Sequence, residues 1–217
     1  LIRRQRQMCI RDSASMCPSH VEGQNPESFA ISDTQRCPPM FEKFIIKLLV
    51  SQKPIKLNLG CGLDKRKDYV NIDVRKEVYP DIVLDLEKVP YPFPDNFADE
   101  ILAKDVLEHF SFRNVQSILK EWHRILKPNG RIIIQTPDFD QIVQKYYNGE
   151  IEKFGDPNTP LWWKLSYWLY GGQDYPENTH KCIFTKSELT KQLERIGFKV
   201  LKVYNDNSNM IIEAVKV

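Results

Sequence analysis

The 217-residue chain has little excess of charge of either sign and few cysteines. Lys and Arg total 31 against 29 for Asp and Glu, and a net charge of +2 gives no basic footprint for nucleic acid or an anionic membrane. The five cysteines are an odd number without a C-x-x-C pair or a His at zinc spacing, which favours a reducing compartment. We therefore predict no metal, no nucleic-acid partner and a cytoplasmic location.

Long apolar runs are also lacking. The run Phe44–Val50 is far shorter than the roughly 18 residues that a membrane-spanning helix needs. The basic N-terminus is followed by polar residues rather than by the apolar centre of a secretory signal. We expect a soluble protein without a membrane span, and its 41% apolar content is enough for one hydrophobic core.

Composition divides the chain into parts. Residues 1–38 are rich in Ser, Gln, Arg and Pro, which predicts a disordered tail, and Arg4–Asp12 resembles translated sequencing-adapter sequence that is not native. Residues 39–53 carry an apolar stripe, including Ile45, Leu48 and Leu49, that predicts an amphipathic helix packed on the core. The remaining domain, 54–217, contains an unusually aromatic insertion at 150–178.

Short β-branched runs alternate with helical patterns along the domain. Strands are predicted at 55–59, 69–73, 81–84, 100–103, 131–135, 198–204 and 210–217. Helices are predicted at 115–126, where Lys127–Gly130 is the stop, and at 187–196, where Gly197 is the stop. The pattern predicts an α/β fold, a mostly parallel sheet covered by helices on both faces and closed by a C-terminal antiparallel hairpin.

Polar or small residues follow three of the predicted strands. Gly60 and Gly62 end the first strand, Asp73 ends the second, and Asp85 follows the third. Ligands of an open α/β sheet bind at the carboxyl ends of its strands, so these positions predict a binding site. Taken singly, each aspartate is equally consistent with the capping of a turn, and the glycines have the alternative of a tight strand-ending turn without a ligand. Lys65 stands where a dinucleotide-binding fingerprint has its third glycine.

Taken in order and spacing, these segments resemble the class I S-adenosylmethionine-dependent methyltransferases, specifically the type 11 group. The resemblance covers 54–217 and is carried by Asn58–Gly62, Asn71–Asp73, Leu84–Asp85, Pro92–Asp95, Val106–His109 and Arg124–Ile132. Gly171–Gln173, His180 and Phe184–Phe198 resemble a small bacterial branch of predicted methyltransferases often associated with surface-glycan pathways. The resemblance to the class I methyltransferases implies a Rossmann-like fold with a seven-stranded sheet.

The resemblance also implies a cofactor, S-adenosylmethionine, and the residues around it. Those residues are Asn58, Gly60, Cys61 and Gly62 at the methionine end, Asp73 on the ribose hydroxyls, Asp85 and Leu86 at the adenine, and Lys104 and Asp105 beside the sulfonium. Two positions depart from the pattern. Asn58 stands where many relatives have an acid, and Asp64 where many have a third glycine.

The implied reaction is in-line methyl transfer to a small-molecule or glycan acceptor. For a hydroxyl acceptor a general base helps, and the candidates for it are His180, Asp138 and His109, in that order. Each of these residues also has a possible structural role instead of a catalytic one. Asp138 is equally well placed to cap a helix, and each histidine can be a packed core residue or a capping residue. The aromatic segment Leu161–Tyr170 would bind an acceptor or pack on the core. The alternative function is an inactive binding or scaffold protein of the same fold, and the oligomeric state is unknown.

Overall fold

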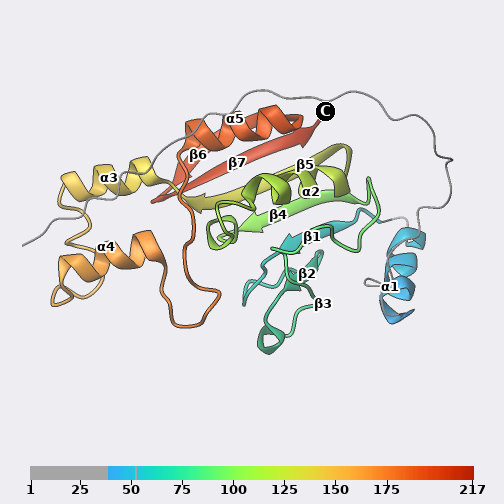
Figure 1. Ribbon diagram of the computed structural model, residues 1–217, viewed down its shortest axis with the longest axis horizontal. Helices are drawn as coiled ribbons and strands as arrows, with labels where there is room; N and C mark the ends of the chain where they lie inside the picture. The colour runs from blue at the N-terminus through green and yellow to red at the C-terminus, as the bar shows by residue number, and fades with distance from the viewer. Residues whose placement is uncertain (1–38, 52) are drawn as a thin grey trace, which may run out of the picture. The chain divides into compact units, whose positions relative to one another are not determined.

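The computed structural model describes residues 39–51 and 53–217, so the predicted tail, 1–38, lies outside the described residues. A seven-stranded sheet has the order β3-β2-β1-β4-β5-β7-β6 (Figure 1). Its strands are β1 (Lys56–Leu59), β2 (Val70–Asp73), β3 (Ile82–Val83), β4 (Ala98–Lys104), β5 (Leu126–Pro137), β6 (Phe198–Asp206) and β7 (Asn209–Lys216). All seven predicted strands are confirmed.

The pairing of the strands confirms the predicted fold class. β1 pairs in parallel with β2 and β4, β4 with β5, and β2 with β3, whereas β7 is antiparallel to both β5 and β6. The strand order reverses between β1 and β4, and a crevice for ligands opens at the carboxyl ends on either side of such a reversal. This edge of the sheet is where the site is expected.

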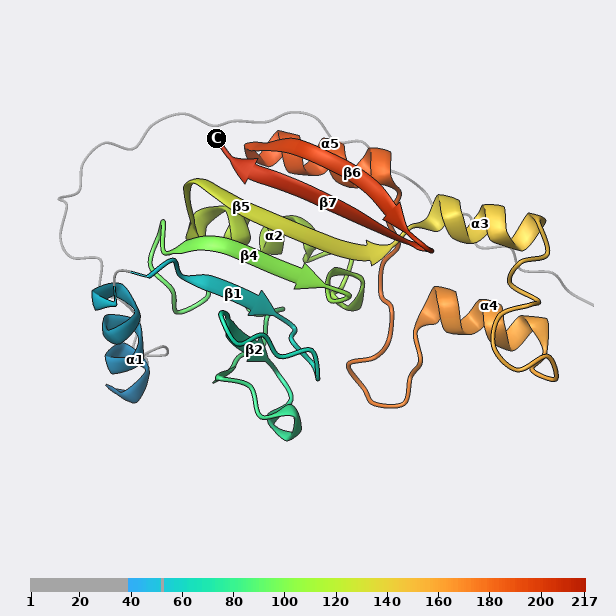
Figure 2. The same cartoon turned by 180° about the vertical axis from the view of Figure 1, so that it is seen from behind.

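The helices are α1 (Pro39–Val50), α2 (Val115–Ile125), α3 (Phe139–Tyr147), α4 (Leu161–Tyr170) and α5 (Lys186–Ile196), with short 3₁₀ turns η1 (Lys76–Val78) and η2 (Leu107–His109). α1 begins as predicted but ends before 53, beside the amino end of β1 (Figure 2). Ile45 is buried there, whereas Leu49 is 53% exposed. Within the described ranges, none of these helices has the length and apolar content that a bilayer crossing demands.

Helices cover one face of the sheet rather than both. α2 and α5 lie on the same face, and no described helix covers the other face of β4, β5, β7 and β6 (Figures 1 and 2). The expectation of two covered faces is therefore wrong for the described part of the chain. That open face carries ion pairs instead, in which Arg131 Nη2 lies 2.6 Å from Glu213 Oε2 and Arg131 Nη1 lies 3.8 Å from Glu100 Oε2.

The crossover from β1 to β2 is short and contains no helix. Side-chain amides hold it in place of helical hydrogen bonds. Asn58 Nδ2 donates to Asp64 O (2.9 Å) and to Asn71 Oδ1 (3.1 Å), and Asn71 Nδ2 donates to Asp81 Oδ2 (2.9 Å). This buried network fixes the chain immediately after β1.

The start of β5 also differs from the sequence prediction. α2 ends at Ile125 and β5 begins at once, so the predicted stop at Lys127–Gly130 is taken into the strand. The register shifts between Ala98 and Glu100 of β4, which is the mark of a β-bulge opposite these residues. The predicted segment 131–135 is therefore the regular centre of a longer strand.

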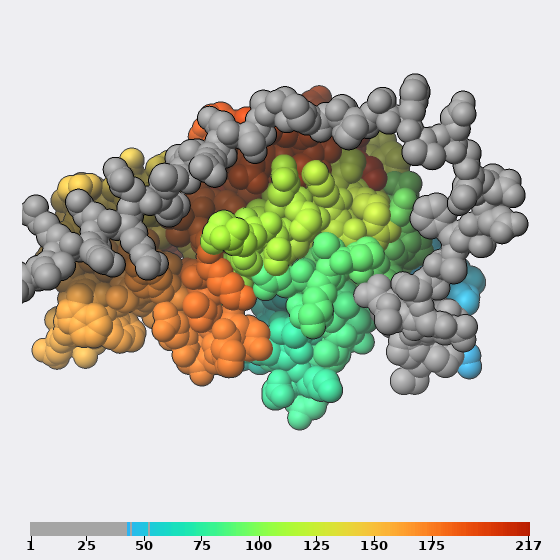
Figure 3. Space-filling model, viewed as in Figure 1, coloured from blue at the N-terminus to red at the C-terminus, as the bar shows by residue number. Residues whose placement is uncertain are grey.

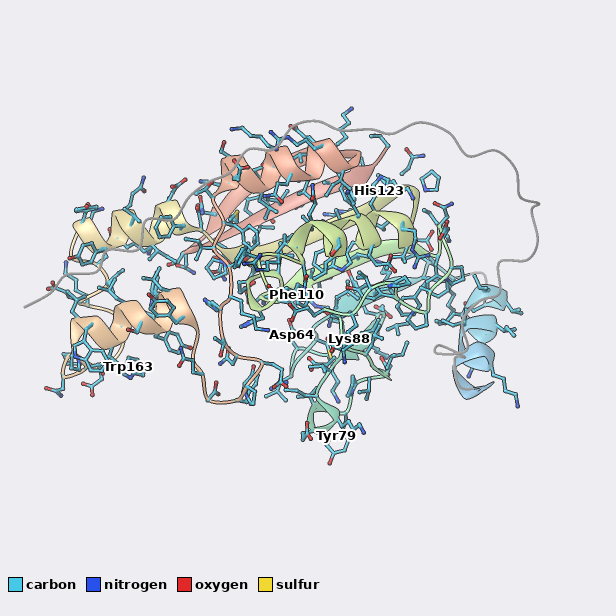
Figure 4. All side chains as sticks on the ribbon, viewed as in Figure 1. Asp64, Tyr79, Lys88, Phe110, His123 and Trp163 are labelled. Carbon is cyan, nitrogen blue, oxygen red and sulfur yellow. The ribbon has the colours of Figure 1, made fainter. Side chains whose placement is uncertain are left out.

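The predicted aromatic insertion, 150–178, follows α3 and contains α4. Of the aromatic side chains on α4, Trp162 is 67% exposed and Tyr170 is 57% exposed. Trp163 projects on the side of α4 away from α3 (Figure 4), and its ring stacks on Tyr167 with centroids 5.6 Å apart. The interpretation of α4 as a helix that packs its aromatic rings onto the core is wrong for these four residues.

Candidate active site

A cavity of about 280 Å³ opens at the carboxyl ends of the parallel strands. We call it the strand-end cavity. Among the predicted site residues, its lining includes Gly60, Asp73, Asp85, Leu86, Asp105 and His109. Residues predicted from four separate segments of the sequence thus meet around one volume.

Gly60 brings the backbone against the end of β4. Its φ is +64°, and a Cβ atom there would lie 2.4 Å from Val106 Cγ2, closer than atoms can approach. Glycine is the residue that has this conformation and this clearance together. The position therefore sets the floor of the strand-end cavity.

Asp73 is a fixed carboxylate at the tip of β2. It is 5% exposed, its Oδ2 accepts from the Gly62 amide (2.8 Å), and its Oδ1 accepts from the Arg75 amide (2.9 Å). Oδ1 also accepts from Arg75 Nε at 3.4 Å, so it carries two hydrogen bonds and Oδ2 carries one. A carboxylate oxygen can accept two hydrogen bonds, so Oδ2 keeps capacity for a hydroxyl, and Oδ1 gains it where a ligand replaces the long contact with Arg75 Nε.

The next part of the wall combines a polar acceptor with apolar side chains. Asp85 Oδ1 accepts from the Glu87 amide at 3.0 Å, and its Oδ2 lies 3.2 Å from Lys88 Nζ. Leu86 (4% exposed) and Phe110 (6% exposed) line the cavity beside it. An apolar slot edged by a carboxylate suits a planar ring that carries an amino group.

Four residues predicted to touch the cofactor do not line the strand-end cavity. Asn58 is 3% exposed and holds the crossover loop, and Cys61 is buried, which raises its thiol pKa to about 11. The Gly62 amide is already bonded to the cavity carboxylate, and Lys104 Nζ lies 3.8 Å from Asp64 Oδ2. Asn58, Cys61 and Gly62 therefore shape the loop after β1, and Lys104 of β4 lies against that loop through Asp64.

The connection from α4 to α5, residues 171–185, forms the remaining wall, and we call it the strap. The Arg75 guanidinium lies 4.0 Å from the ring centroid of Tyr175, and Lys181 Nζ lies 3.2 Å from Glu87 Oε2. In Figure 3 the strap, in orange, abuts the green and cyan surface of the β2–β4 region. The sequence analysis did not predict these wall residues, because each contact joins segments that are far apart in the sequence. The one available signal was the presence of aromatic and basic residues in the strap.

A second cavity, of about 360 Å³, lies under α4, and we call it the α4 cavity. Aromatic rings and small polar side chains share its lining, which includes Phe154, Tyr167, Trp168, Asn178, His180 and Asn209. Among the described residues that line it there is no Lys or Arg, and Asp206 is the acidic one, whose carboxylate can accept hydrogen bonds from hydroxyl groups. This cavity suits a neutral molecule with both apolar faces and hydrogen-bonding groups.

Two histidines lie side by side, one at each cavity, and we call their place the junction. His109 lines the strand-end cavity, His180 lines the α4 cavity, and their ring centroids are 5.0 Å apart. Burial lowers the pKa of both imidazoles, so both are neutral near pH 7 and can accept a proton. Asp105 belongs to the same junction, because its carboxylate accepts from Asn209 Nδ2 at 3.2 Å.

Asp138, the third predicted base, is held elsewhere. It is 0% exposed and lines neither cavity. Its side chain caps α3 through the Asp140 amide (3.2 Å), accepts from Asn205 Nδ2 (2.8 Å) and pairs with Lys186 Nζ (3.6 Å). The structure thus assigns it the capping role that the sequence left open, and the substrate-facing expectation is wrong.

Comparison with known proteins identifies the family of the chain. A family model described as a methyltransferase domain matches residues 4–203. The chain belongs to the methyltransferase-domain family. It is a class I S-adenosylmethionine-dependent methyltransferase, its cofactor is S-adenosylmethionine, and the type 11 subdivision stays a prediction.

Solved structures agree with the methyltransferase in fold. A SAM dependent methyltransferase from Archaeoglobus fulgidus is 15% identical with a TM-score of 0.51, over 81% of this chain and 94% of that one. An S-adenosylmethionine dependent methyltransferase from Mesorhizobium loti is 14% identical with a TM-score of 0.51, over 79% and 96%. At these identities the likeness concerns the fold alone.

One curated relative is much larger than the methyltransferase. A highly reducing polyketide synthase of Aspergillus nomiae is 30% identical over 141 residues, which are 56% of this chain. The matched region spans 5% of the length of that relative.

The strand-end cavity fits the chemistry of S-adenosylmethionine. Asp73 offers a fixed carboxylate with a remaining acceptor site on Oδ2 for a ribose hydroxyl, and Asp85 offers an acceptor for the adenine amino group beside Leu86 and Phe110. The floor at Gly60 is a position that a Cβ would fill. The volume is close to the lower limit of about 300 Å³ for small-ligand sites, which agrees with a cavity covered by the strap.

Proposed function

We propose that this methyltransferase transfers a methyl group to a hydroxyl of a neutral, polyhydroxylated acceptor, a small molecule or a glycan, bound in the α4 cavity. The observation that supports the proposal is that His109 of the strand-end cavity and His180 of the α4 cavity have ring centroids 5.0 Å apart. Aromatic rings beside amide and hydroxyl groups are the lining that sugar rings favour, and a lining without Lys or Arg does not favour a phosphate.

Orientation is the main task of the chain's own residues. The bound cofactor supplies a methyl group already activated on a sulfonium. Asp73 and Asp85 would hold its adenosine part, and the α4 cavity would hold the acceptor oxygen on the other side of the junction. Alignment of this kind is worth effective molarities of about 10⁵–10⁸ M in intramolecular reactions.

His180 is the proposed general base. It lines the acceptor side of the junction, and its neutral imidazole has a lone pair for the hydroxyl proton. The ring of His109 lies against it, and His109 Nδ1 donates to Thr179 O (3.2 Å) when its lone pair is on Nε2. His109 therefore serves to position His180 and to close the cofactor side.

The proposal is tested in two steps on the full chain. Calorimetry should show saturable binding of S-adenosylmethionine, weakened about 100-fold by Asp73→Ala, because two hydrogen bonds to a charged group are worth about 3 kcal/mol together. The matched control is Asp68→Ala, an exposed carboxylate that lines neither cavity.

A panel of neutral mono- and oligosaccharides is then assayed for S-adenosylhomocysteine formation. His180→Gln should lower kcat about 10²-fold or more while cofactor binding is retained. Turnover of phosphorylated but not neutral acceptors would overturn the acceptor class, and full activity of His180→Gln would overturn the base.

A further inference from the structure

Glu108 is a buried carboxyl that the proposed reaction does not yet use. It lies in η2, is 2% exposed, and its Oε2 accepts from Thr136 Oγ1 at 2.9 Å. Burial raises its pKa to about 8, with a smaller contribution from Asp105. Burying an ionisable group costs folding free energy, so the place of Glu108 beside the proposed reaction centre indicates a role in the reaction.

Its location is next to the two histidines. A carboxylate oxygen of Glu108 and ring nitrogens of His109 and His180 all lie within 4.8 Å of one another. Glu108 and His180 also line one enclosed space of about 10 Å³, together with Thr136 and Cys182. That space is about the size of one water probe, so a single water can join the carboxyl to the imidazole.

The backbone holds Glu108 and the strap together. The amides of Lys181 and Cys182 both donate to Glu108 O, at 2.8 and 3.3 Å. These bonds attach the residues that directly follow His180 to the residue that precedes His109. The spacing between carboxyl and imidazole is thus set by main-chain contacts and not by a mobile side chain alone.

The charges around Glu108 come from three elements. The segment between β4 and η2 contributes Asp105, and η2 contributes His109. The strap contributes His180 and Lys181, and the Cys182 thiol is neutral because burial raises its pKa to about 12. From β5 the neighbour is the uncharged hydroxyl of Thr136. Of these, His180 is the group whose charge would change during the proposed reaction.

We propose that Glu108 is the positioning and charge-balancing partner of His180, a Glu–His pair that completes the general base; this rests on the proposed function. As the acceptor O–H bond breaks, its proton goes to the His180 nitrogen and its electron pair forms the O–CH₃ bond. The electron pair of the broken C–S bond stays on the sulfur atom. Glu108, ionised, stabilises the imidazolium through the water between them.

The first experiment follows the imidazole of His180 by NMR across the pH range, on the full chain without cofactor or acceptor. The His180 ring signal, assigned by its loss in His180→Gln, should show a second inflection near pH 8 when Glu108 ionises. Glu108→Gln should remove that inflection. Glu121→Gln, another buried glutamate, which bonds to Arg124 instead, should leave it in place.

The second experiment uses any saccharide that turns over in the panel. Glu108→Gln should lower kcat about 10²-fold and remove the rise of kcat through an apparent pKa near 8, with the KM of the acceptor unchanged. Glu108→Asp should restore part of the pH-dependent limb.

The two experiments separate this proposal from the proposed function. An inflection that survives Glu108→Gln, or an unchanged pH profile in that variant, overturns the pair. Activity that chelators abolish also overturns it, because the same three side chains would then be metal ligands. A panel without turnover speaks against the proposed function, whereas the NMR result still decides whether Glu108 and His180 titrate together.

Discussion

Replacing Glu108 by Gln should make the protein more stable at high pH and leave it nearly unchanged at low pH. Gln keeps the shape and can still accept from Thr136 Oγ1, so the change removes the ionisation and little else. The native pKa of about 8 lies above the ordinary value of 4.5, so the native state holds a proton that the unfolded state has released.

The sign and size follow from this difference in proton binding. Between about pH 4.5 and about pH 8 the wild type loses stability as pH rises, with a slope of about 1.4 kcal/mol per pH unit from this group. The largest loss of stability that this ionisation can cause is about 5 kcal/mol, and relaxation around the buried charge makes the actual loss smaller. We therefore expect the free energy of unfolding of Glu108→Gln to exceed that of the wild type by about 2–5 kcal/mol at about pH 9.

The assay is urea unfolding of both proteins at a series of pH values. The other titrating groups are common to both, so the difference between the two free energies of unfolding isolates residue 108. A difference that does not change with pH would refute the argument, because the carboxyl would then have an ordinary pKa. Lower stability of Glu108→Gln at every pH would show that the carboxylate is favourably paired.

Three further predictions concern the cavities. Gly60→Ala should destabilise the fold by about 1–3 kcal/mol in thermal unfolding and abolish calorimetric binding of the cofactor, because its Cβ would meet Val106. Tyr175→Leu should speed cofactor release about 2–5-fold in stopped-flow measurements, since it removes a cation–π contact worth about 0.5–1 kcal/mol. Tyr167→Leu should raise the KM for a saccharide several-fold with kcat unchanged, because the ring lines the α4 cavity.

Each of these substitutions has a matched control in the chain. Gly149→Ala shares a positive φ (+66°) but meets nothing within 4 Å, so equal losses at both glycines would disprove the steric argument. Phe112→Leu removes another aromatic contact with an arginine, outside the strand-end cavity, and should leave cofactor release unchanged. Tyr204→Leu removes a tyrosine of β6 that lines neither cavity, and an equal rise in KM there would disprove the role of Tyr167.

Local patterns in the sequence predicted the sheet well because strand periodicity and turn residues are local signals. Asp73 and Asp85 were found in this way, since Asp73 ends β2 and Asp85 lies just beyond the end of β3, at the carboxyl ends that face the cavity. Asn58 was misplaced because a residue at the end of β1 can turn either to the cavity or to the loop, and Asn71, 13 residues away, decides between the two.

Contacts between distant segments could not be predicted in the same way. The bond of the Lys181 amide to Glu108 O joins residues that no periodicity relates. The exposure of Trp162 on α4 likewise depends on what packs against the helix, and an aromatic residue alone does not reveal this. Sequence reasoning therefore predicted the individual parts of the site better than the way in which they assemble.

The strap has a consequence for how the two ligands influence each other. Tyr175 and Lys181 border the strand-end cavity, and Asn178 and His180, between them in sequence, border the α4 cavity. A ligand that orders one side of this short segment lowers the entropy cost of ordering the other side. Binding of the two ligands should then be cooperative. The bound cofactor should raise the affinity for the acceptor by the same factor by which the bound acceptor raises the affinity for the cofactor.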